Sequence, residues 1–378
     1  MTPVDLDGRR ILVVVYGHVA DTLAAVPAIR SLRGVYPSAR IEALVVSASA
    51  SILRGCPYLD EVITWKDFQL KGSRWARAEK GAVLTALGLR IRSRRYDAVL
   101  VFHRSFRSVR RLATLSGASV RAGVSAGRDG YTHAIASPTG IHSSRDENRR
   151  VLEAIGVVED GGPLELWTTE ADEAAASRLL AGARRPLVGL HSGSDWSCQQ
   201  WLPDRWADVA RSLQSEIGAT VVITGSASEV RLQDEICEGL PVQPLRLAGA
   251  TSLGELVAVI RQLDLLLCVN SAPAAIARAV GTRAVVLLGP EDPRLTGLEP
   301  SSRLGIVQPG RRMEPGSWCE FGRWGVLSGC ESPMCRAISG LDLLASRDVI
   351  SAATALLAAS EDDIDRQLAP RASREISN

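Results

Sequence analysis

The sequence predicts an α/β protein with two doubly wound domains, each a parallel sheet with helices on both faces. Short and continuously apolar runs, such as 11–15 and 265–269, are typical of parallel strands that are buried on both faces. These runs alternate with segments of helical periodicity along most of the chain. The alternation pauses at 156–167, a stretch of linker composition, and then restarts. Because 378 residues suit two domains of about 150–200 residues each, we expect two Rossmann-like domains that face each other across a cleft.

The first domain is predicted to span 1–160. Its strands are expected at 11–15, 41–46, 61–64, 98–102 and 121–124. Its helices are expected at 21–33, 49–54, 66–95, 107–115 and 144–155. Pro27 lies inside the first of these helices, where its ring is expected to kink the helix.

The second domain is predicted to span 169–345. Its strands are expected at 187–190, 220–224, 246–247, 265–269 and 284–288. Its helices are expected at 169–182, 203–217, 228–238 and 252–263, with an Ala-rich helix between the last two strands. An amphipathic helix follows at 339–358. We assign 346–378 to this C-terminal helix and to a charged tail that we expect to be mobile.

Composition excludes several classes of protein. The chain is 46% hydrophobic and 23% charged, as expected of a folded soluble protein. Its formal charge of +2 argues against a protein that binds nucleic acid through bulk charge. No apolar run is long enough to span a bilayer, and the N-terminus lacks the apolar region of a signal peptide. We therefore expect a cytoplasmic protein whose contact with a membrane, if any, is limited to the surface.

The cysteines predict neither a disulfide framework nor a metal centre. Seven cysteines are scattered along the chain, an odd count that argues against paired thiols in a cytoplasmic protein. Cys319, Cys330 and Cys335 form a cluster without a nearby His or a fourth Cys, so we expect a reduced loop rather than a zinc site. The D-x-D sequence at Asp363 and Asp365 lies in the charged tail, where a catalytic metal is not expected.

The segment 264–293 predicts a ligand site. An apolar strand runs into the small-residue turn Asn270, Ser271 and Ala272, and the Ala-rich helix follows after Pro273. In parallel α/β sheets, ligands bind at the carboxyl ends of strands and at the amino termini of the helices that follow. We therefore expect this turn to bring backbone N–H groups close to a phosphate.

Two further strand ends of the second domain carry small or polar residues. His191, Ser192, Gly193 and Ser194 follow the first strand of that domain, and such hydroxyl and glycine residues suit oxygen-rich phosphates. Thr224 and Gly225 repeat the pattern at the next strand end. Glu229, early in the following helix, either bonds ribose hydroxyls or complements the helix dipole.

The loop after the first strand of the chain contains two candidate bases. Asp21 lies where a helix is predicted to begin, so its carboxylate either caps that helix or accepts a proton from an acceptor hydroxyl in the cleft. His18 lies in the same loop and is a second candidate base, or a hydrogen-bond partner. Both lie at the predicted carboxyl end of a buried strand.

Basic residues follow the strand that ends at Phe102. His103, Arg104 and Arg107 are candidates for gripping an anionic acceptor, and Arg110 and Arg111 continue the cluster. The alternative is a solvated basic face, because the basic residues of this chain are almost all arginine. Walker and G-x-G-x-x-G patterns are absent, which weighs against a kinase or a dehydrogenase.

The residues resemble glycosyltransferase family 9, the heptosyltransferase-like GT-B enzymes, from about Ile11 to Leu357. The resemblance begins with ILVVVYGHVADTLAAVPAIRSLRGVYPSARI and continues through VGLHSGSDWSCQQWLPDRWADVARSL, VVITGSASE and LAGATSLGEL. It ends with CVNSAPAAIARAVGTRAVVLLGPEDP and SPMCRAIS. Each motif is modest by itself, but their order and spacing together are specific.

The resemblance implies a GT-B fold with a nucleoside-diphosphate sugar bound mainly by the second domain and a C-terminal helix that packs back toward the first. It also implies transfer with inversion at the anomeric carbon, without a metal ion or a cofactor. Asp21 falls on the family's catalytic aspartate, which favours the base over the cap. The acceptor would be a small molecule or a glycolipid.

The chain departs from the family pattern at several positions of the implied donor site. Gln199 stands where the family has a phosphate-contacting lysine, and Ala20 replaces the usual glycine before Asp21. Asn270, Ala272 and Ala275 replace an acid, a glycine and a histidine. The departures predict a different donor sugar or a different way of holding the diphosphate, or else decay of activity.

Three functions follow as hypotheses. The leading one is an inverting glycosyltransferase, and its arginine-rich composition suggests a GC-rich bacterium and a secondary-metabolite acceptor such as an antibiotic. The second is a lipopolysaccharide core heptosyltransferase. The third is a catalytically silent homologue that binds a nucleotide-sugar.

Overall fold

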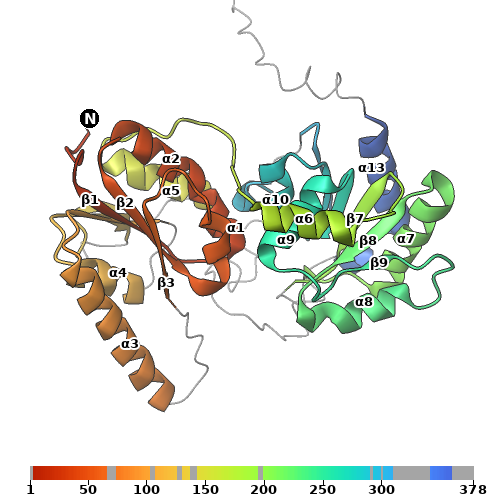
Figure 1. Ribbon diagram of the computed structural model, residues 1–378, viewed down its shortest axis with the longest axis horizontal. Coiled ribbons are helices and arrows are strands. Elements are labelled where there is room, and N and C mark those ends of the chain that lie inside the picture. The colour runs from red at the N-terminus through yellow and green to blue at the C-terminus, as the bar shows by residue number, and fades with distance from the viewer. Residues whose placement is uncertain are drawn as a thin grey trace, which may run out of the picture. The chain divides into compact units, whose positions relative to one another are not determined.

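The structure is a computed structural model in which the chain divides into two compact units. The structure describes residues 3–65, 74–102, 107–125, 130–136, 143–194, 199–289, 293–298, 301–309 and 341–359. The first unit is Met1–Thr169 with Arg294–Gly297, and the second is Glu170–Pro293 with Leu298–Asn378 (Figure 1). The charged tail and the cluster of Cys319, Cys330 and Cys335 lie outside the described residues.

The first unit is built on a six-stranded sheet in which every neighbouring pair is parallel, as predicted. Its strand order is β3-β2-β1-β4-β5-β6. The strands are β1 (Arg10–Val15), β2 (Arg40–Val46), β3 (Glu61–Trp65), β4 (Ala98–Phe102), β5 (Val120–Val124) and β6 (His133–Ile135). The helices are α1 (Val19–Ala24), α2 (Val26–Val35), the 3₁₀ helix η1 (Ser47–Leu53), α3 (Arg74–Ser93), α4 (Arg107–Leu115) and α5 (Ser144–Ala154).

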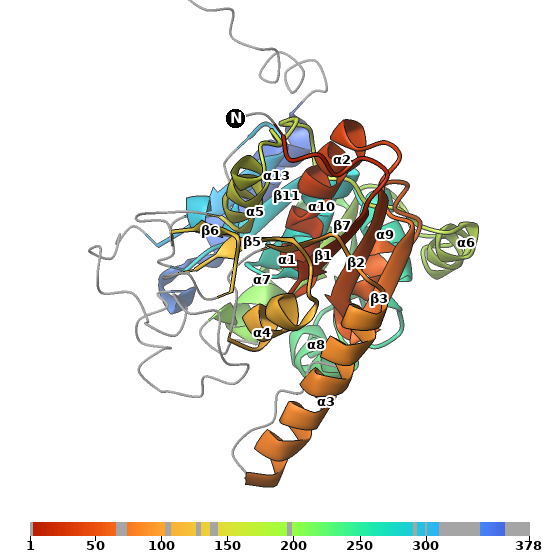
Figure 2. The same cartoon turned by 90° about the vertical axis from the view of Figure 1, so that its left-hand side faces the viewer.

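Helices cover both faces of this first sheet. Leu12 and Val14 point to the face covered by α3 and α4, where they join Leu87, Ile91 and Leu112 in one apolar cluster. The two figures show α2 and α5 on the opposite face (Figures 1 and 2). Every residue of β1 from Ile11 to Val15 is fully buried, which explains why the strand is apolar at every position.

The predicted helix 21–33 is two helices that meet at Ala25. Pro27 occupies the first turn of α2, where a missing N–H costs little because the first amides of a helix have no partner in that helix. The prediction of a kink was therefore wrong in its form, since Pro27 begins a helix rather than bending one. Similarly, the helix predicted at 49–54 is the 3₁₀ helix η1.

The second unit repeats the plan with the strand order β12-β11-β10-β7-β8-β9, again with parallel pairs. The strands are β7 (Leu187–His191), β8 (Thr220–Thr224), β9 (Leu245–Arg246), β10 (Leu265–Val269), β11 (Ala284–Leu287) and β12 (Leu304–Val307). The α-helices are α6 (Glu170–Leu179), α7 (Pro203–Ile217), α8 (Val230–Cys237), α9 (Leu253–Gln262), α10 (Ala272–Val280) and α13 (Ser346–Ala358). Its 3₁₀ helices are η3 (Ala227–Glu229) and η5 (Leu341–Leu343), whereas most of η4 (Pro293–Thr296) belongs to the first unit.

The C-terminal helix is part of the second unit. It packs on α7 and on the strands β10, β11 and β12. Its residues Val349 and Ala353 are fully buried in the same core cluster as Trp206 and Leu213 of α7. Its apolar face therefore covers the second sheet, and the expectation that this helix packs back toward the first domain stays a prediction.

Both sheets reverse their strand order beside their first strand. In the first unit, β1 lies between β2 and β4, and in the second, β7 lies between β8 and β10. Ligands of open α/β sheets bind outside the carboxyl ends of the strands at such a switch point. The topology thus selects the loops after β1 and β4 in one unit, and after β7 and β10 in the other.

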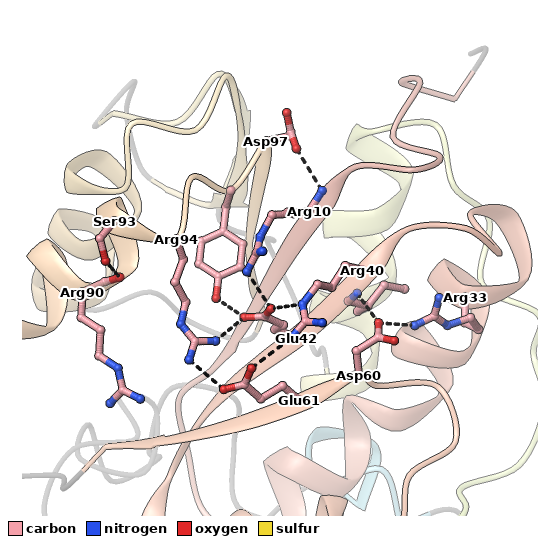
Figure 3. A network of polar contacts seen from close by, with 12 residues as sticks. Arg10, Arg33, Arg40, Glu42, Asp60, Glu61, Arg90, Ser93, Arg94 and Asp97 are labelled. Atoms are coloured by element: carbon pink, nitrogen blue, oxygen red, sulfur yellow. Dashed lines mark hydrogen bonds and ion pairs between the residues drawn. The ribbon is translucent and has the colours of Figure 1, made fainter.

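A buried carboxylate ties the opposite, amino-terminal end of the first sheet together (Figure 3). Glu42 of β2 is fully buried and accepts hydrogen bonds from Arg40 Nε at 2.6 Å, Arg94 Nη1 at 2.7 Å, Arg10 Nη2 at 2.9 Å and the Tyr96 hydroxyl. Burial raises the pKa of Glu42, but these donors outweigh it, so that the pKa lies below its usual 4.5. The network therefore holds an ionised carboxylate far along the strands from the switch point.

Candidate functional site

Asp21 lies in the first turn of α1, directly after the carboxyl end of β1. The helix is capped at His18, and Asp21 is the third residue of the helix. Its Oδ2 atom accepts a hydrogen bond from the His18 backbone N–H at 3.0 Å. Asp21 is therefore not the N-cap, although it completes the capping box of that helix. The structure places it at the switch point of the first sheet and leaves it partly exposed.

The second oxygen of Asp21 contacts a residue that the sequence did not single out. Ser144, the first residue of α5, donates its hydroxyl to Asp21 Oδ1 at 2.7 Å. The two residues are 123 positions apart. No local sequence motif predicts this contact, because it depends on how α5 packs against α1.

Gly17 is also part of this arrangement. A Cβ atom at Gly17 would lie 2.4 Å from Asp21 Oδ2 and 2.6 Å from Asp21 Cβ. The backbone of the loop therefore passes so close to the carboxylate that only glycine fits without a shift. Sequence reading could have found this residue as the glycine that follows a buried strand end.

The structure gives His18 a backbone role beside Asp21. Its N–H binds the carboxylate, and its C=O accepts a hydrogen bond from the Thr22 hydroxyl at 3.1 Å. The residue itself is exposed. His18 therefore helps to shape the loop whether or not its imidazole takes part in chemistry.

His191 is a buried residue at the end of the central strand β7. It lies between Thr224 of β8 and Cys268 of β10 in register. Its Nδ1 atom is 2.9 Å from the Thr224 hydroxyl, and that hydroxyl donates to the Leu190 carbonyl at 3.4 Å. Burial lowers the pKa of His191 below 6.5, against an opposing effect of the Glu229 charge. At neutral pH the imidazole is therefore neutral.

Glu229 joins the loops that follow β7 and β8. Its Oε2 atom accepts a hydrogen bond from the Ser226 N–H at 2.6 Å, within the capping box of η3. A Cβ atom at Gly193 would lie 1.8 Å from Glu229 Oε1, and one at Gly225 would lie 2.9 Å from Oε2. The two glycines thus make room for this carboxylate. The helix-start interpretation of Glu229 agrees with the capping box, and the carboxylate also faces the strand-end loops.

Ser194 and Gln199 are brought together in the loop after β7. The Ser194 hydroxyl donates to Gln199 Oε1 at 2.9 Å, and the Gln200 side-chain amide donates to the Ser194 carbonyl at 3.0 Å. Ser192 is buried beside them. Gln199 therefore closes this loop with a neutral hydrogen bond at the position where the resemblance implies a lysine.

The turn after β10 leads directly into α10. Ser271 is the N-cap, but its hydroxyl donates back to the Val269 carbonyl at 3.3 Å, and no side chain caps the helix among the described residues. Ala272 and Pro273 form the first turn, and Pro273 has no N–H to donate. The backbone N–H of Ala272 is thus the group of this turn that suits an anion, together with the helix dipole. Asn270 links the strand to this turn.

The predicted acceptor-binding residues after β4 lie largely outside the part of the chain that the structure describes. Arg107 begins α4, but its side-chain surroundings, and the whole of His103 and Arg104, lie outside the described residues. Within the described ranges, no group of three or more His, Cys, Asp or Glu side chains is placed to hold a metal ion. Among the described helices, none combines the length and the apolar character that a membrane span requires.

The profile of glycosyltransferase family 9 (heptosyltransferase) matches residues 84–311, more than half of the chain. The lipopolysaccharide core heptosyltransferase OpsX of Haemophilus influenzae is 24% identical over 284 residues, which are 74% of this chain and 78% of the relative.

Two solved structures share the fold. The family 9 glycosyl transferase of Veillonella parvula has a TM-score of 0.79 at 22% identity and covers 94% of this chain and 99% of its own. The ADP-heptose lps heptosyltransferase II of Escherichia coli has a TM-score of 0.69 at 20% identity, with coverages of 92% and 98%. The chain with these two Rossmann-like units therefore belongs to glycosyltransferase family 9.

Proposed function

We propose that this glycosyltransferase moves a heptose, or a related sugar, from a nucleoside-diphosphate sugar to an acceptor hydroxyl, with inversion and without a metal ion. The observation that carries the proposal is the carboxylate of Asp21. It lies at the switch point of the first sheet, and its two oxygens accept hydrogen bonds from the His18 N–H and from the Ser144 hydroxyl. A carboxylate held in this way, yet partly exposed, suits a general base.

The proposed step is a single displacement. The ionised Asp21 carboxylate accepts the proton of the acceptor hydroxyl while the acceptor oxygen forms a bond to the anomeric carbon. The bond from that carbon to the diphosphate oxygen breaks, and its electron pair leaves with the diphosphate. Attack opposite to the leaving group gives inversion.

The second unit supplies groups that suit the donor. The first turn of α10 offers the Ala272 N–H and the positive end of the helix dipole to the diphosphate. Ser194 adds a hydroxyl, and Glu229 is the candidate for the ribose hydroxyls. Because Gln199 and Asn270 are neutral, binding would depend on such neutral donors and on the dipole rather than on ion pairs.

The descriptions of two similar proteins suggest which donor and which acceptor to test first. One solved neighbour is described as an ADP-heptose lps heptosyltransferase, and OpsX is described as a lipopolysaccharide core heptosyltransferase. We therefore propose ADP-heptose as the first donor to test and a lipopolysaccharide core as the first acceptor. The secondary-metabolite acceptor rests on composition and serves as the competing acceptor class.

The proposal is tested with the purified full chain. ADP-, GDP-, UDP- and dTDP-sugars are compared by thermal shift, and transfer is then assayed with glycolipid-core and small-molecule acceptors, with and without EDTA. We expect stabilisation by one donor class, EDTA-insensitive transfer and inverted product. Stabilisation without transfer to any acceptor would instead favour the catalytically silent homologue.

The base is tested by comparing two variants. Asp21→Asn keeps the shape of the side chain and is expected to lower kcat by roughly 10²–10⁴-fold, the usual contribution of a general base. His18→Ala keeps the backbone N–H that binds Asp21 and is expected to retain most of the activity. The reverse order of effects would assign the base to His18.

A further inference from the structure

Ser144 and Asp21 form a contact between the starts of two helices. Asp21 Oδ1 accepts the Ser144 hydroxyl at 2.7 Å, and Oδ2 accepts the His18 N–H at 3.0 Å. The two donors come from α5 and from the start of α1, so they hold the carboxylate from two separate elements. A carboxylate bound at both oxygens has little freedom to rotate.

The start of α5 is itself fixed in several directions. Ser143 caps the helix, with the Asp146 N–H donating to its hydroxyl at 3.2 Å and its own N–H donating to Asp146 Oδ2 at 3.0 Å. Arg145 binds Glu159 and the Gly162 carbonyl, at 3.0 and 2.7 Å. The contacts of Arg145 join the start of α5 to the segment around Glu159 and Gly162.

A further hydrogen bond joins α5 to α1 directly. Asn148, which is fully buried, donates its side-chain amide to the Ala24 carbonyl at the end of α1, at 3.1 Å. The two helices are thus linked near both ends of α1, by Ser144 at Asp21 and by Asn148 at Ala24. Such support from rigid elements is what places a reacting group to within a fraction of an ångström.

We infer that Ser144 is a positioning residue for the transfer, whose hydroxyl orients the Asp21 carboxylate toward the acceptor hydroxyl. This inference rests on the proposed role of Asp21 as base. Ser144 keeps its own proton throughout. The acceptor proton passes to Asp21, the acceptor oxygen bonds to the anomeric carbon, and the electron pair of the broken bond leaves with the diphosphate.

Other charged groups near Asp21 are largely engaged. On α5, Arg145 pairs with Glu159 and Asp146 binds Ser143, while Glu147 is buried. On α2, Arg30 pairs with Asp160 and Arg33 with Asp60, and η1 contributes no charged residue. Tyr16 and His18 are titratable residues of the loop between β1 and α1.

The test compares Ser144→Ala with Ser144→Thr, which restores a hydroxyl, and with Ser143→Ala as a matched control. In Ser144→Ala we expect kcat to fall by about 10-fold or more while the KM for the donor is unchanged, because the donor suits the other unit. Ser144→Thr should recover most of the lost kcat.

The control separates this role from a structural one. Ser143→Ala removes the cap of α5 and should lower the Tm, but it should leave kcat near the wild-type value, because the Ser143 hydroxyl binds Asp146. A wild-type kcat in Ser144→Ala would overturn the inference, as would an equal loss of kcat in Ser143→Ala. Asp21→Asn is measured beside these variants, and full activity in Asp21→Asn would overturn the proposed function itself. If Asp21→Asn loses activity while Ser144→Ala keeps the wild-type kcat, only the positioning role of Ser144 is overturned.

Discussion

At the scale of single residues, Asp21 combines two roles that the sequence left as alternatives. Its carboxylate completes the capping box of α1 and still lies at a ligand-binding edge of the sheet. The capping contact uses Oδ2 and the contact to Ser144 uses Oδ1. A residue at a helix start can therefore be held for chemistry by the same hydrogen bonds that stabilise the helix.

Gly17→Ala tests how closely the loop must approach Asp21. Gly17 is not among the glycines with positive φ, so a substitution acts through contact rather than through backbone strain. The new Cβ atom, 2.4 Å from Oδ2, would push the carboxylate aside, and we expect kcat to fall by roughly 10–100-fold. Steady-state kinetics measure the effect.

Gly34→Ala is the matched control. A Cβ atom at Gly34, inside α2, meets nothing within 4 Å. This variant should keep its activity and gain about 0.5–1 kcal/mol of unfolding free energy, because alanine is the better helix former. A Gly17→Ala enzyme with wild-type kinetics would contradict the close approach described here.

At the scale of helices and strands, the alternation of apolar runs predicted the inner strands well. Strands β4 and β10 are buried along their whole length, and β1 is buried from Ile11 to Val15, so these stretches are continuously apolar. The strands β6 and β12 were missed because they are short edge strands with partly exposed residues. Their place in the sheet depends on neighbours rather than on their own sequence.

The candidate site was predictable to the same degree. Strand ends and the family resemblance located Asp21, Glu229 and the turn at Asn270. They could not locate Ser144, because serine is common at the start of helices. Its contact with Asp21 depends on the packing of α5 against α1, which the sequence does not show.

The Glu42 network gives a prediction that concerns several strands at once. It joins β1, β2 and β3 with the end of α3, and Glu61, the cross-strand neighbour of Glu42, shares Arg40 and Arg94 with it. Glu42→Gln removes the charge that these partly exposed arginines match. We expect a loss of about 1.5–3 kcal/mol of unfolding free energy at neutral pH, the usual contribution of a hydrogen bond to a charged group.

The same network predicts a pH dependence. Because the pKa of Glu42 is lower in the folded protein than its usual 4.5, its stabilising effect is complete above that value and is lost as the pH falls through the folded pKa. Chemical denaturation between neutral and acidic pH should show the wild type losing this increment on acidification. The difference between wild type and Glu42→Gln should shrink over that range; a constant difference would contradict an ionised Glu42.

At the scale of the whole molecule, the chain uses one architecture twice. Each unit has six parallel strands in the same order and reverses that order beside its first strand. The two predicted sets of residues lie at these two switch points, Asp21 in the first unit and the loops around Gly193 and Asn270 in the second. Under the proposed function, the first unit supplies the base and the second supplies the donor-binding groups.

This division predicts that binding and chemistry respond separately to substitution. Asp21→Asn should leave the donor-induced thermal shift unchanged, since the groups that suit the donor belong to the second unit. Glu229→Gln should instead weaken that shift, because it removes a charged acceptor from the proposed ribose contact. Thermal shift titrations with the donor identified for the wild type check both outcomes.

The measurement that most directly tests Asp21 as the base of an inverting transfer is an NMR assay of the transfer product with the wild type and Asp21→Asn. We predict a product of inverted anomeric configuration from the wild type, and formation roughly 10²–10⁴-fold slower in Asp21→Asn. Retained configuration, or a wild-type rate in Asp21→Asn, would contradict this role.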